Sequence, residues 1–378
     1  MSKPRIACVV GTRPDTIKNV PVFIELKKFA DRCDPVLVAT GQHREMMDQA
    51  LAAFEVRPDI DLDIMQVGQT LAEVTSRALD GLERVFKENR PDFVIAQGDT
   101  ATTFVASLAA FYHRIPFGHV EAGLRTPTVQ DPFPEEFYRR ASALITHQHY
   151  PPTQWAKQNL LREHHDPETI FVTGNTGIDA VLRIAEAQKQ DWLTGHEGRV
   201  FVLTTHRREN WGEPQRRIAE ACLALVERYP DSVLVAAMHR NPIVRETLTS
   251  VLGGHPRIQL IEPPEYARFV KLMQRATLIL TDSGGVQEEA PAFGIPVLVL
   301  RETTERPEGV ESGNAKLVGT DKDLIYSEAV RLLDEPDAYA SMSAAASPYG
   351  DGLAAPRIRY LALKSLGVES PEVPMWEL

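Results

Sequence analysis

Short apolar runs alternate along this chain with longer stretches in which apolar residues recur every three or four positions. The short runs cover 5–10, 35–39, 92–96, 116–120 and 170–172, and later 200–203, 232–236, 258–261, 278–280 and 296–300. Runs of this kind predict buried strands, and the stretches between them predict amphipathic helices. Because strands that alternate with helices form parallel sheets, the pattern predicts an α/β fold class.

The pattern restarts after a polar stretch at 188–198, which predicts two Rossmann-like, doubly wound domains. A chain of 378 residues also exceeds the size at which a single core stops growing. We expect an N-terminal domain over 1–178 and a C-terminal domain over 179–354. Ligands bind open α/β sheets beyond the carboxyl ends of the strands, so the residues just after each strand are candidates for function.

Composition excludes several classes of function. The formal net charge of −11 argues against a binder of nucleic acid or of membrane surfaces, which would need a basic face. The three cysteines are far apart, which suggests neither a disulfide framework nor a paired zinc motif. No apolar run is long enough for a signal peptide or a membrane span. We therefore expect a cytoplasmic protein with no nucleic-acid or membrane partner.

The residues after the first strand form a cationic corner. Pro14 can open a helix at its first position, and Arg13 and Lys18 can then both face a ligand. The segment lacks the three-glycine spacing of a dinucleotide fingerprint, and the chain has no Walker-type Gly-Lys-Ser/Thr. These absences argue against nicotinamide and ATP as ligands. A surface arginine and lysine without a specific role is the alternative interpretation.

Three carboxylates in the first half follow a strand or begin a helix: Asp99, Glu121 and Glu135. Any one of them alone would more often be a helix cap than a catalytic group. Several acids on one sheet edge favour catalysis, because crowded carboxylates push their pKa values apart and supply separate acid and base. The sequence therefore predicts acid–base chemistry at this edge.

The stretch 282–289 is typical of a pyrophosphate site. An apolar strand ends at Ser283, and a helix-compatible run begins at Gly284 and Gly285. Such a turn points backbone N–H groups and the positive end of the helix dipole outward, and glycines let a phosphate approach closely. Glu289 lies one helical turn further, within reach of a sugar hydroxyl. The alternative is a tight strand-to-helix turn followed by an exposed acidic helix.

Cationic groups recur after the other strands of the second half. They are His206, Arg207 and Arg208, then His239 and Arg240, and finally the segment 301–308. Imidazole and guanidinium groups can neutralise the charge that develops when a phosphate departs. We also expect many of these charges to pair with neighbouring acids as structural partners.

Two patterns that resemble metal sites are discounted. Asp61 and Asp63 lie within 60–64, whose period of two is typical of a half-buried strand with its acids outward. The run 164–166 lacks a Cys or His at helical spacing that would complete a site. No structural metal is expected.

Taken in order, these segments resemble the non-hydrolysing UDP-N-acetylglucosamine 2-epimerases, a family with the two-domain GT-B fold. The motifs are 11–14, 42–46, 97–100, 118–126, 134–136, 174–176, 206–209, 282–291 and 303–308. The resemblance implies an interdomain cleft, a C-terminal helix within 355–378 that crosses back to the N-terminal domain, and a homodimer. It also implies a role in cell-surface polysaccharide synthesis.

The resemblance assigns roles to individual residues. Asp99, Glu121, Glu135 and His206 correspond to catalytic positions. The substrate-binding positions are Arg13, Lys18, Arg139, Tyr266, Phe269, Ser283, Gly284, Gly285, Glu289 and Arg306, with the uracil against 264–269. In this family an additional UDP-GlcNAc can bind as an activator, and Gln42, His43, Arg208 and His239 match positions of that type.

The implied reaction is the reversible epimerisation of UDP-GlcNAc to UDP-ManNAc at C2. This carbon has no carbonyl beside it to stabilise a carbanion, so simple proton abstraction faces a prohibitive barrier. Anti elimination of UDP to 2-acetamidoglucal, followed by re-addition, avoids that barrier. Carboxylates on both faces of the sugar ring are then required, and no cofactor is expected.

Some positions depart from the family pattern. Tyr138 stands where an amide is expected near the sugar, which leaves a modified UDP-HexNAc open as the substrate. The other departures are Asp15, Gly68, His147 and Gly177. A hydrolysing epimerase that releases ManNAc and UDP is a further alternative. A GT-B glycosyltransferase or a non-catalytic nucleotide-sugar sensor is less favoured, because neither needs the three carboxylates together.

Overall fold

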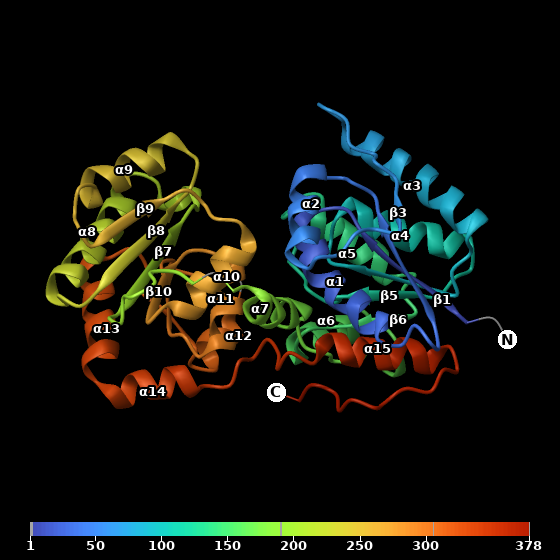
Figure 1. Cartoon of the computed structure of the whole chain (residues 1–378). Helices are drawn as coiled ribbons and strands as arrows, with labels where there is room; N and C mark the ends of the chain where they lie inside the picture. Colours follow the sequence, from blue (N-terminus) through green and yellow to red (C-terminus); the bar gives the residue numbers. More distant parts are fainter. Residues whose placement is uncertain (1–2, 190, 305, 378) are drawn as a thin grey trace. The chain divides into compact units, whose positions relative to one another are not determined.

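The computed structural model describes residues 3–189, 191–304 and 306–377. The chain divides into two compact units, one of Met1–Ala180 with Gly350–Leu378 and one of Val181–Tyr349 (Figure 1). Each unit contains one six-stranded sheet. Every pair of neighbouring strands in both sheets is parallel, so the predicted α/β class with two Rossmann-like sheets is confirmed.

The first sheet has the strand order β3-β2-β1-β4-β5-β6. Its strands are β1 (Arg5–Val10), β2 (Asp34–Ala39), β3 (Ile60–Asp61), β4 (Phe93–Gln97), β5 (Phe117–Val120) and β6 (Gln148–Tyr150). The direction of winding changes between β1 and β4, which is the topological switch point where such sheets bind ligands. The carboxyl ends of β1, β4 and β5 are therefore the first place to examine.

Helices cover this sheet and fix the loops at its carboxyl edge. They are α1 (Arg13–Lys27), α2 (Arg44–Ala53), α3 (Leu71–Glu88), α4 (Ala101–Tyr112), α5 (Glu135–Ala143), α6 (Gln154–Arg162), the start of α7 (Thr176–Ala187), and α15 (Ala354–Ser365). The C-terminal helix α15 packs against α1. Its first backbone N–H groups, at Ala354 and Ala355, donate to the buried carboxylate of Asp179, at 3.2 and 2.8 Å.

The second sheet has the order β12-β11-β10-β7-β8-β9, which is the same winding as the first. Its strands are β7 (Val200–Thr205), β8 (Val233–Met238), β9 (Ile258–Ile261), β10 (Leu278–Thr281), β11 (Val297–Val299) and β12 (Ala315–Leu317). Its helices are α8 (Glu213–Arg228), α9 (Pro242–Leu252), α10 (Tyr266–Arg275), α11 (Gly284–Glu289), α12 (Pro307–Glu311), α13 (Lys322–Asp334) and α14 (Pro336–Ala344).

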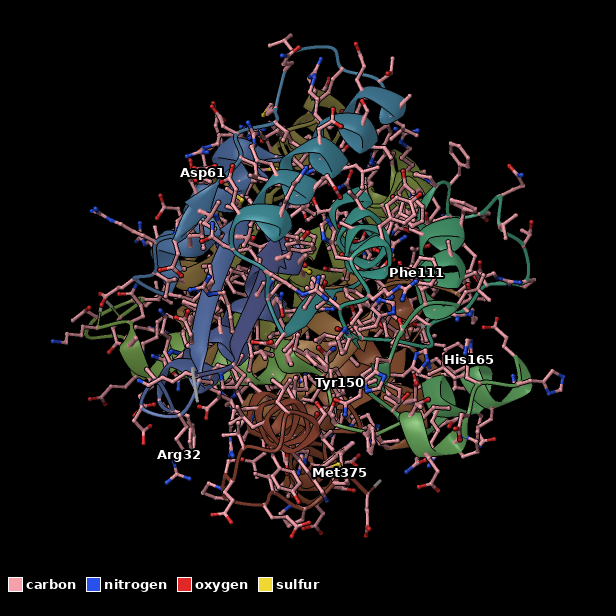
Figure 2. All side chains as sticks on the ribbon, turned by 90° about the vertical axis from the view of Figure 1, so that its right-hand side faces the viewer. Arg32, Asp61, Phe111, Tyr150, His165 and Met375 are labelled. Atoms are coloured by element: carbon pink, nitrogen blue, oxygen red, sulfur yellow. The ribbon has the colours of Figure 1, made fainter. Side chains whose placement is uncertain are left out.

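The interior of each unit follows from the apolar runs of its strands. Phe93, Phe117 and Tyr150 are fully buried in the first unit, and Figure 2 shows Tyr150 among the interior side chains. Its hydroxyl donates to Gln148, so its one polar atom is satisfied. In the second unit Phe201 and the leucines of β7, β8 and β10 belong to the corresponding buried core. No helix in the described part of the chain could cross a membrane.

The structure corrects two of the predicted strands. Residues 170–172 form no strand, and Ile170 makes only a single bridge with His149. The strand predicted over 60–64 shortens to Ile60–Asp61, because Asp63 turns the chain with a φ of 46°. The strands β6 and β12 at the sheet edges, with three residues each, were not predicted.

Candidate active site

The carboxyl edge of the first sheet brings together three segments that are distant in sequence. Neighbouring register places Gln97 beside Val120, so the turn at Gly98 and Asp99 lies next to Glu121. The segment after β1 joins them because β1 pairs with β4. Gly98 and Glu121 both have positive φ, 81° and 63°. The chain therefore leaves β4 and β5 by sharp turns.

Glu121 is held on both of its carboxylate oxygens. The ammonium of Lys18, from α1, donates to Oε1, and the side-chain amide of Gln97, the last residue of β4, donates to Oε2. The Glu121 side chain is 12 % exposed. A carboxylate that is fixed by a cation and an amide, yet open to solvent on one side, has the features of a general base. Gln97 could not be recognised as a functional residue from its type, because its neutral side chain does not transfer protons by itself.

Asp99 is paired with Arg139 from α5. The guanidinium donates to Asp99 Oδ2 from Nε at 2.9 Å, and Nη2 lies 2.6 Å from the same oxygen. It also donates to the fully buried Glu136 at 2.9 Å, and Glu136 in turn accepts from Arg140 at 2.8 Å. Burial opposes ionisation of Arg139, but these two carboxylates raise its pKa above the ordinary value. Arg139, which the family resemblance assigns to substrate binding, therefore also orients Asp99.

Glu135, the third predicted carboxylate, is the first residue of α5 and is half-buried. It shares this short helix with Arg139, one turn further along. Because Arg139 contacts Asp99, the same helix carries Glu135 toward the edge where Asp99 lies. The structure therefore places Asp99, Glu121 and Glu135 on neighbouring elements of one unit.

The β1–α1 turn presents Arg13 and hides Asp15. Arg13 is exposed at the first position of α1. Asp15 is buried, accepts from the backbone N–H groups of Gly11 (3.1 Å) and Thr12 (2.8 Å), and accepts from the Thr100 hydroxyl at 3.1 Å. Burial raises its pKa to about 6 despite these hydrogen bonds. Asp15 is therefore the acid of a capping box at the start of α1.

Gln42 and His43 lie after β2, at the start of α2. The side-chain oxygen of Gln42 accepts from the backbone N–H of Thr102 at 3.1 Å and from its hydroxyl at 2.9 Å, which ties it to the beginning of α4. His43 is exposed. Gln42 thus has a structural partner in addition to the role that the resemblance assigns to it.

In the second unit, Asp282 organises the carboxyl edge of the sheet. This fully buried carboxylate accepts from the backbone N–H groups of His206 and Arg207, from the Thr205 hydroxyl and from the Asn210 amide, all at 2.9–3.0 Å. Burial favours the neutral acid, but the hydrogen bonds and charge of His206 prevail and lower the pKa of Asp282. The imidazole Nδ1 of His206 lies 3.0 Å from the carboxylate, which fixes the exposed ring.

The glycine turn after β10 forms the second part of this edge. Ser283 is the N-cap of α11, and its hydroxyl makes no capping hydrogen bond with the described residues. A Cβ at Gly285 would meet no described atom within 4 Å, whereas one at Gly284 would lie 2.8 Å from the Arg306 guanidinium carbon. Arg306 donates to Glu288 at 2.8 Å. The turn thus combines amides of a first helical turn with a guanidinium, a combination that suits an anion.

The remaining predicted residues of the second unit lie on α10 and on the loops after β7 and β8. The Tyr266 hydroxyl donates to Glu289 at 3.0 Å, and Phe269 is half-buried one turn along the same helix. The rings of His206 and His239 are 6.3 Å apart. Arg208 is exposed on the short turn Arg208–Asn210.

Tyr138, one of the departures from the family pattern, is a buried residue of α5. Its side chain is 7 % exposed and stacks on Phe104 with ring centres 5.2 Å apart, within the core under α4 and α5. Its hydroxyl interacts with Thr75, and burial raises the pKa of Tyr138, with a smaller contribution from the charge of Glu135.

The discounted acidic pair has a structural partner. Arg44 contacts Asp61 at 2.6 Å and Asp63 at 3.6 Å, so both acids neutralise one guanidinium. Among the residues that the structure describes, no group of three or more His, Cys, Asp and Glu could hold a metal ion.

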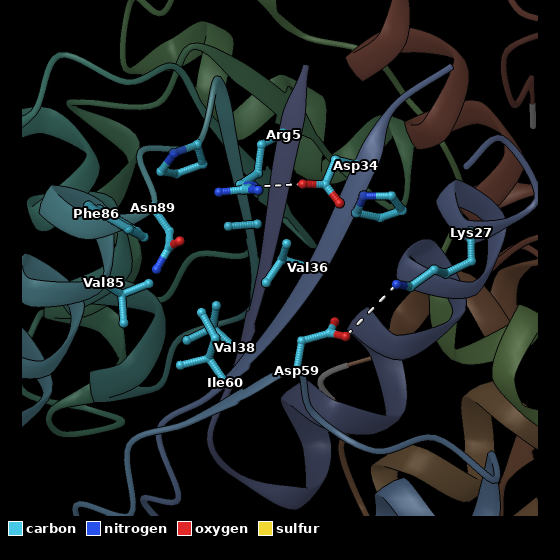
Figure 3. A pocket seen from close by; sticks show the side chains of 13 residues that line it. Arg5, Lys27, Asp34, Val36, Val38, Asp59, Ile60, Val85, Phe86 and Asn89 are labelled. Atoms are coloured by element: carbon cyan, nitrogen blue, oxygen red, sulfur yellow. Dashed lines mark hydrogen bonds and ion pairs between the residues drawn. The ribbon is translucent and has the colours of Figure 1, made fainter. Parts of the chain in front are cut away.

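A cavity of about 280 Å³ lies in the first unit, away from these residues (Figure 3). It is lined by the start of β1, by most of β2, by Ile60 of β3 and by the ends of α1 and α3. The ion pairs Arg5–Asp34 (2.7 Å) and Lys27–Asp59 (3.9 Å) border it. Ligands of this fold class bind at the carboxyl edge of the sheet, so we do not assign the candidate active site to this cavity.

The two Rossmann-like parallel sheets are those of GT-B-like epimerases and glycosyltransferases. A solved glycosyltransferase of kitacinnamycin shares the two-unit GT-B-like fold with a TM-score of 0.64 at 14 % identity, covering 96 % of this chain and 99 % of that one. The family profile "UDP-N-acetylglucosamine 2-epimerase" matches residues 26–362. The chain belongs to the UDP-N-acetylglucosamine 2-epimerase family, whose members are isomerases.

Two relatives illustrate the similarity. The UDP-N-acetylglucosamine 2-epimerase of Bacillus subtilis (strain 168) is 50 % identical over 360 residues, which are 95 % of this chain and 94 % of that protein. The crystal structure of UDP-GlcNAc 2-epimerase from Neisseria meningitidis, bound to UDP-GlcNAc, has a TM-score of 0.81 at 43 % identity. It covers 95 % of this chain and all of that one.

Proposed function

We propose that this protein catalyses the reversible epimerisation of UDP-GlcNAc to UDP-ManNAc at C2. Membership of the family supports the reaction, and the Neisseria meningitidis relative with bound UDP-GlcNAc supports the substrate. The observation that carries the proposal is the carboxylate edge of the first unit, where Asp99 and Glu121 are each oriented by a cation. A sensor without turnover would have no use for acids held in this way.

The reaction proceeds by elimination and re-addition. One carboxylate takes the C2 proton, the electron pair of that C–H bond forms the C1–C2 double bond, and the C1–O pair leaves with UDP. The resulting 2-acetamidoglucal is protonated at C2 from the opposite face, and UDP adds back at C1. Asp99, Glu121 and Glu135 supply the acid and the base, and Lys18 holds Glu121 in place through their ion pair.

The second unit stabilises the departing diphosphate. The backbone amides at Ser283, Gly284 and Gly285 receive it, and Arg306 adds a positive charge above Gly284. His206, whose ring is fixed by Asp282, contributes the second cation of this unit. We assign the ribose to Glu289, which Tyr266 orients, and the uracil to the segment 264–269 beside Phe269.

Further assignments rest on the family resemblance. We propose that Arg13 faces the diphosphate, and that an activating UDP-GlcNAc contacts Gln42, His43, Arg208 and His239. We also propose a cytoplasmic homodimer, with an N-terminal catalytic domain over 1–178 and a UDP-binding domain over 179–354. The helix within 355–378 then returns to the first domain.

Incubation with UDP-GlcNAc in deuterated water tests the proposal, with the anomeric and C2 protons followed by NMR. We expect UDP-ManNAc to appear and C2 deuterium to enter both epimers, because C2 is deprotonated and reprotonated in each direction. Free ManNAc with UDP would instead identify a hydrolysing enzyme. No exchange at C2, with or without added activator, would contradict the substrate and direct the search to modified UDP-sugars.

A further inference from the structure

Gln97 is the residue of the carboxylate edge whose role the proposed mechanism does not yet use. It ends β4 with its side chain 3 % exposed, and its backbone oxygen accepts from the Thr103 hydroxyl at 2.5 Å. Its Cα is in register with Val120, the residue before Glu121. The side chain thus has a fixed origin on a buried strand, and its amide donates to Glu121 Oε2.

The turn that follows Gln97 is also hydrogen-bonded to the neighbouring strand, β5. The backbone N–H of Gly98 donates to Val120 at 3.0 Å, and His119 Nε2 lies 2.7 Å from the Gly98 oxygen. Burial lowers the pKa of His119 to about 4, so the ring is neutral at physiological pH and donates this hydrogen bond from Nε2–H. These hydrogen bonds therefore fix the turn that carries Asp99 relative to the turn that carries Glu121.

The chemistry of an amide suits this position. A base needs its carboxylate fixed without losing its ability to accept a proton. The Lys18 ammonium already neutralises Glu121, and a second cation would make the carboxylate a weaker base. An amide donates a hydrogen bond, carries no net charge and does not titrate, so it orients the group with little effect on its basicity.

We propose that Gln97 is a positioning residue for the epimerisation: with Lys18, it holds the Glu121 carboxylate in one orientation toward the reacting carbon. This assignment rests on the proposed function, because it gives Glu121 a proton to transfer. Gln97 itself touches neither substrate nor the reacting atoms.

The first test replaces Gln97 by methionine, which has a similar length but donates no hydrogen bond. We expect kcat for UDP-GlcNAc to fall roughly 10- to 100-fold, since a misplacement of about 1 Å costs that much. The dissociation constant for UDP, measured by calorimetry, should change less than about twofold, because the diphosphate is assigned to the other unit. The matched control is Gln148→Met, which removes another buried, hydrogen-bonded glutamine from the same sheet.

The control separates positioning from stability. Both variants lose a buried hydrogen bond and should show comparable decreases in Tm, but Gln148→Met should keep its kcat within about twofold. Equal losses of kcat in the two variants would overturn the positioning role. So would a Gln97→Met protein with normal kcat.

A second variant, Gln97→Glu, keeps the shape and adds a carboxylate next to Glu121. Gln97 contacts the Glu121 carboxylate, as Lys18 does, so two carboxylates at positions 97 and 121 would share a proton. We expect the acidic limb of the kcat–pH profile to move upward by about one pH unit or more, a change that loss of stability does not produce. An unmoved profile would contradict the assignment.

The outcomes distinguish the two levels of inference. If the unaltered protein shows no C2 exchange with UDP-GlcNAc, the proposed function fails and this assignment fails with it. If the unaltered protein epimerises UDP-GlcNAc and Gln97→Met does so equally well, only the positioning role fails.

Discussion

The two sheets have the same strand order but opposite chemistry at their carboxyl edges. In the first unit the edge carries the carboxylates Asp99 and Glu121, each with a cationic partner and each open to solvent on one side. In the second unit it carries a glycine turn beside Arg306, and its central carboxylate, Asp282, is fully buried. We therefore propose that one topology serves proton transfer in one unit and anion binding in the other.

The difference between the carboxylates is one of accessibility and of hydrogen bonding. Asp282 accepts from several donors, and its pKa is lowered although burial opposes this, so it stays ionised and orients His206. Glu121 accepts from Lys18 and from Gln97 and retains exposed surface. An acid that exchanges protons must be reachable by its substrate, whereas an acid that holds a loop is best enclosed.

The largest effect should follow from neutralising the accessible acids. Glu121→Gln or Asp99→Asn should lower kcat about 10²- to 10⁴-fold, because each removes a group assigned to proton transfer. UDP affinity should stay within about twofold of the unaltered protein. Turnover is measured by NMR and UDP binding by calorimetry.

The matched control for these acid substitutions is Asp61→Asn. It replaces a carboxylate of the same unit that pairs with Arg44, and it should leave kcat unchanged. Full activity in both Glu121→Gln and Asp99→Asn would contradict the assignment of acid–base chemistry to the first unit.

The second effect concerns the anion-binding edge. Arg306→Ala should weaken UDP binding by about 1.5–3 kcal/mol, the usual contribution of a hydrogen bond to a charged group, or roughly 10- to 150-fold in the dissociation constant. Arg331→Ala is the control, because it also breaks an arginine–glutamate pair, with Glu328 at 3.0 Å, on α13 of the same unit. Equal UDP affinity in the two variants would show that Arg306 only secures its own loop.

A third prediction concerns the enclosed acid. Asp282→Asn leaves one or more buried donors unpaired, and each should cost about 1–3 kcal/mol of unfolding free energy at pH 7. Because the folded-state pKa of Asp282 is lowered, its contribution is present above the unfolded pKa of about 3.9 and is lost as pH falls below it. The difference between variant and unaltered protein in urea midpoint should therefore shrink near pH 3. A constant difference would mean that the charge of Asp282 contributes little.

Most of the fold could be predicted because continuous apolar runs mark strands that are buried on both faces. The edge strands β6 and β12 have three residues each, too few to form a recognisable apolar run. The segment 170–172 is as apolar as a true strand, but only Ile170 makes a bridge to its neighbour. Pairing depends on tertiary context, which a single sequence does not contain.

The candidate site was predictable where residue type determines chemistry. Acids, cations and glycines at strand ends predicted both edges, and the structure places Asp99, Glu121 and Ser283 there. Gln97 and Asp282 remained unassigned because their roles come from what they contact. The burial of Tyr138 could not be predicted for a related reason: a position within a motif does not indicate to which side of a helix its ring points.

The smallest effect should come from Tyr138→Phe, which tests whether the first edge extends to the buried side of α5. The ring stacks on Phe104 and its hydroxyl interacts with Thr75, so its loss should cost about 0.5–1.5 kcal/mol of unfolding free energy. Turnover of UDP-GlcNAc should stay within about twofold, because the phenol lies in the core. A changed preference between UDP-GlcNAc and a modified UDP-HexNAc would instead place Tyr138 at the sugar and would support the modified UDP-HexNAc as the substrate.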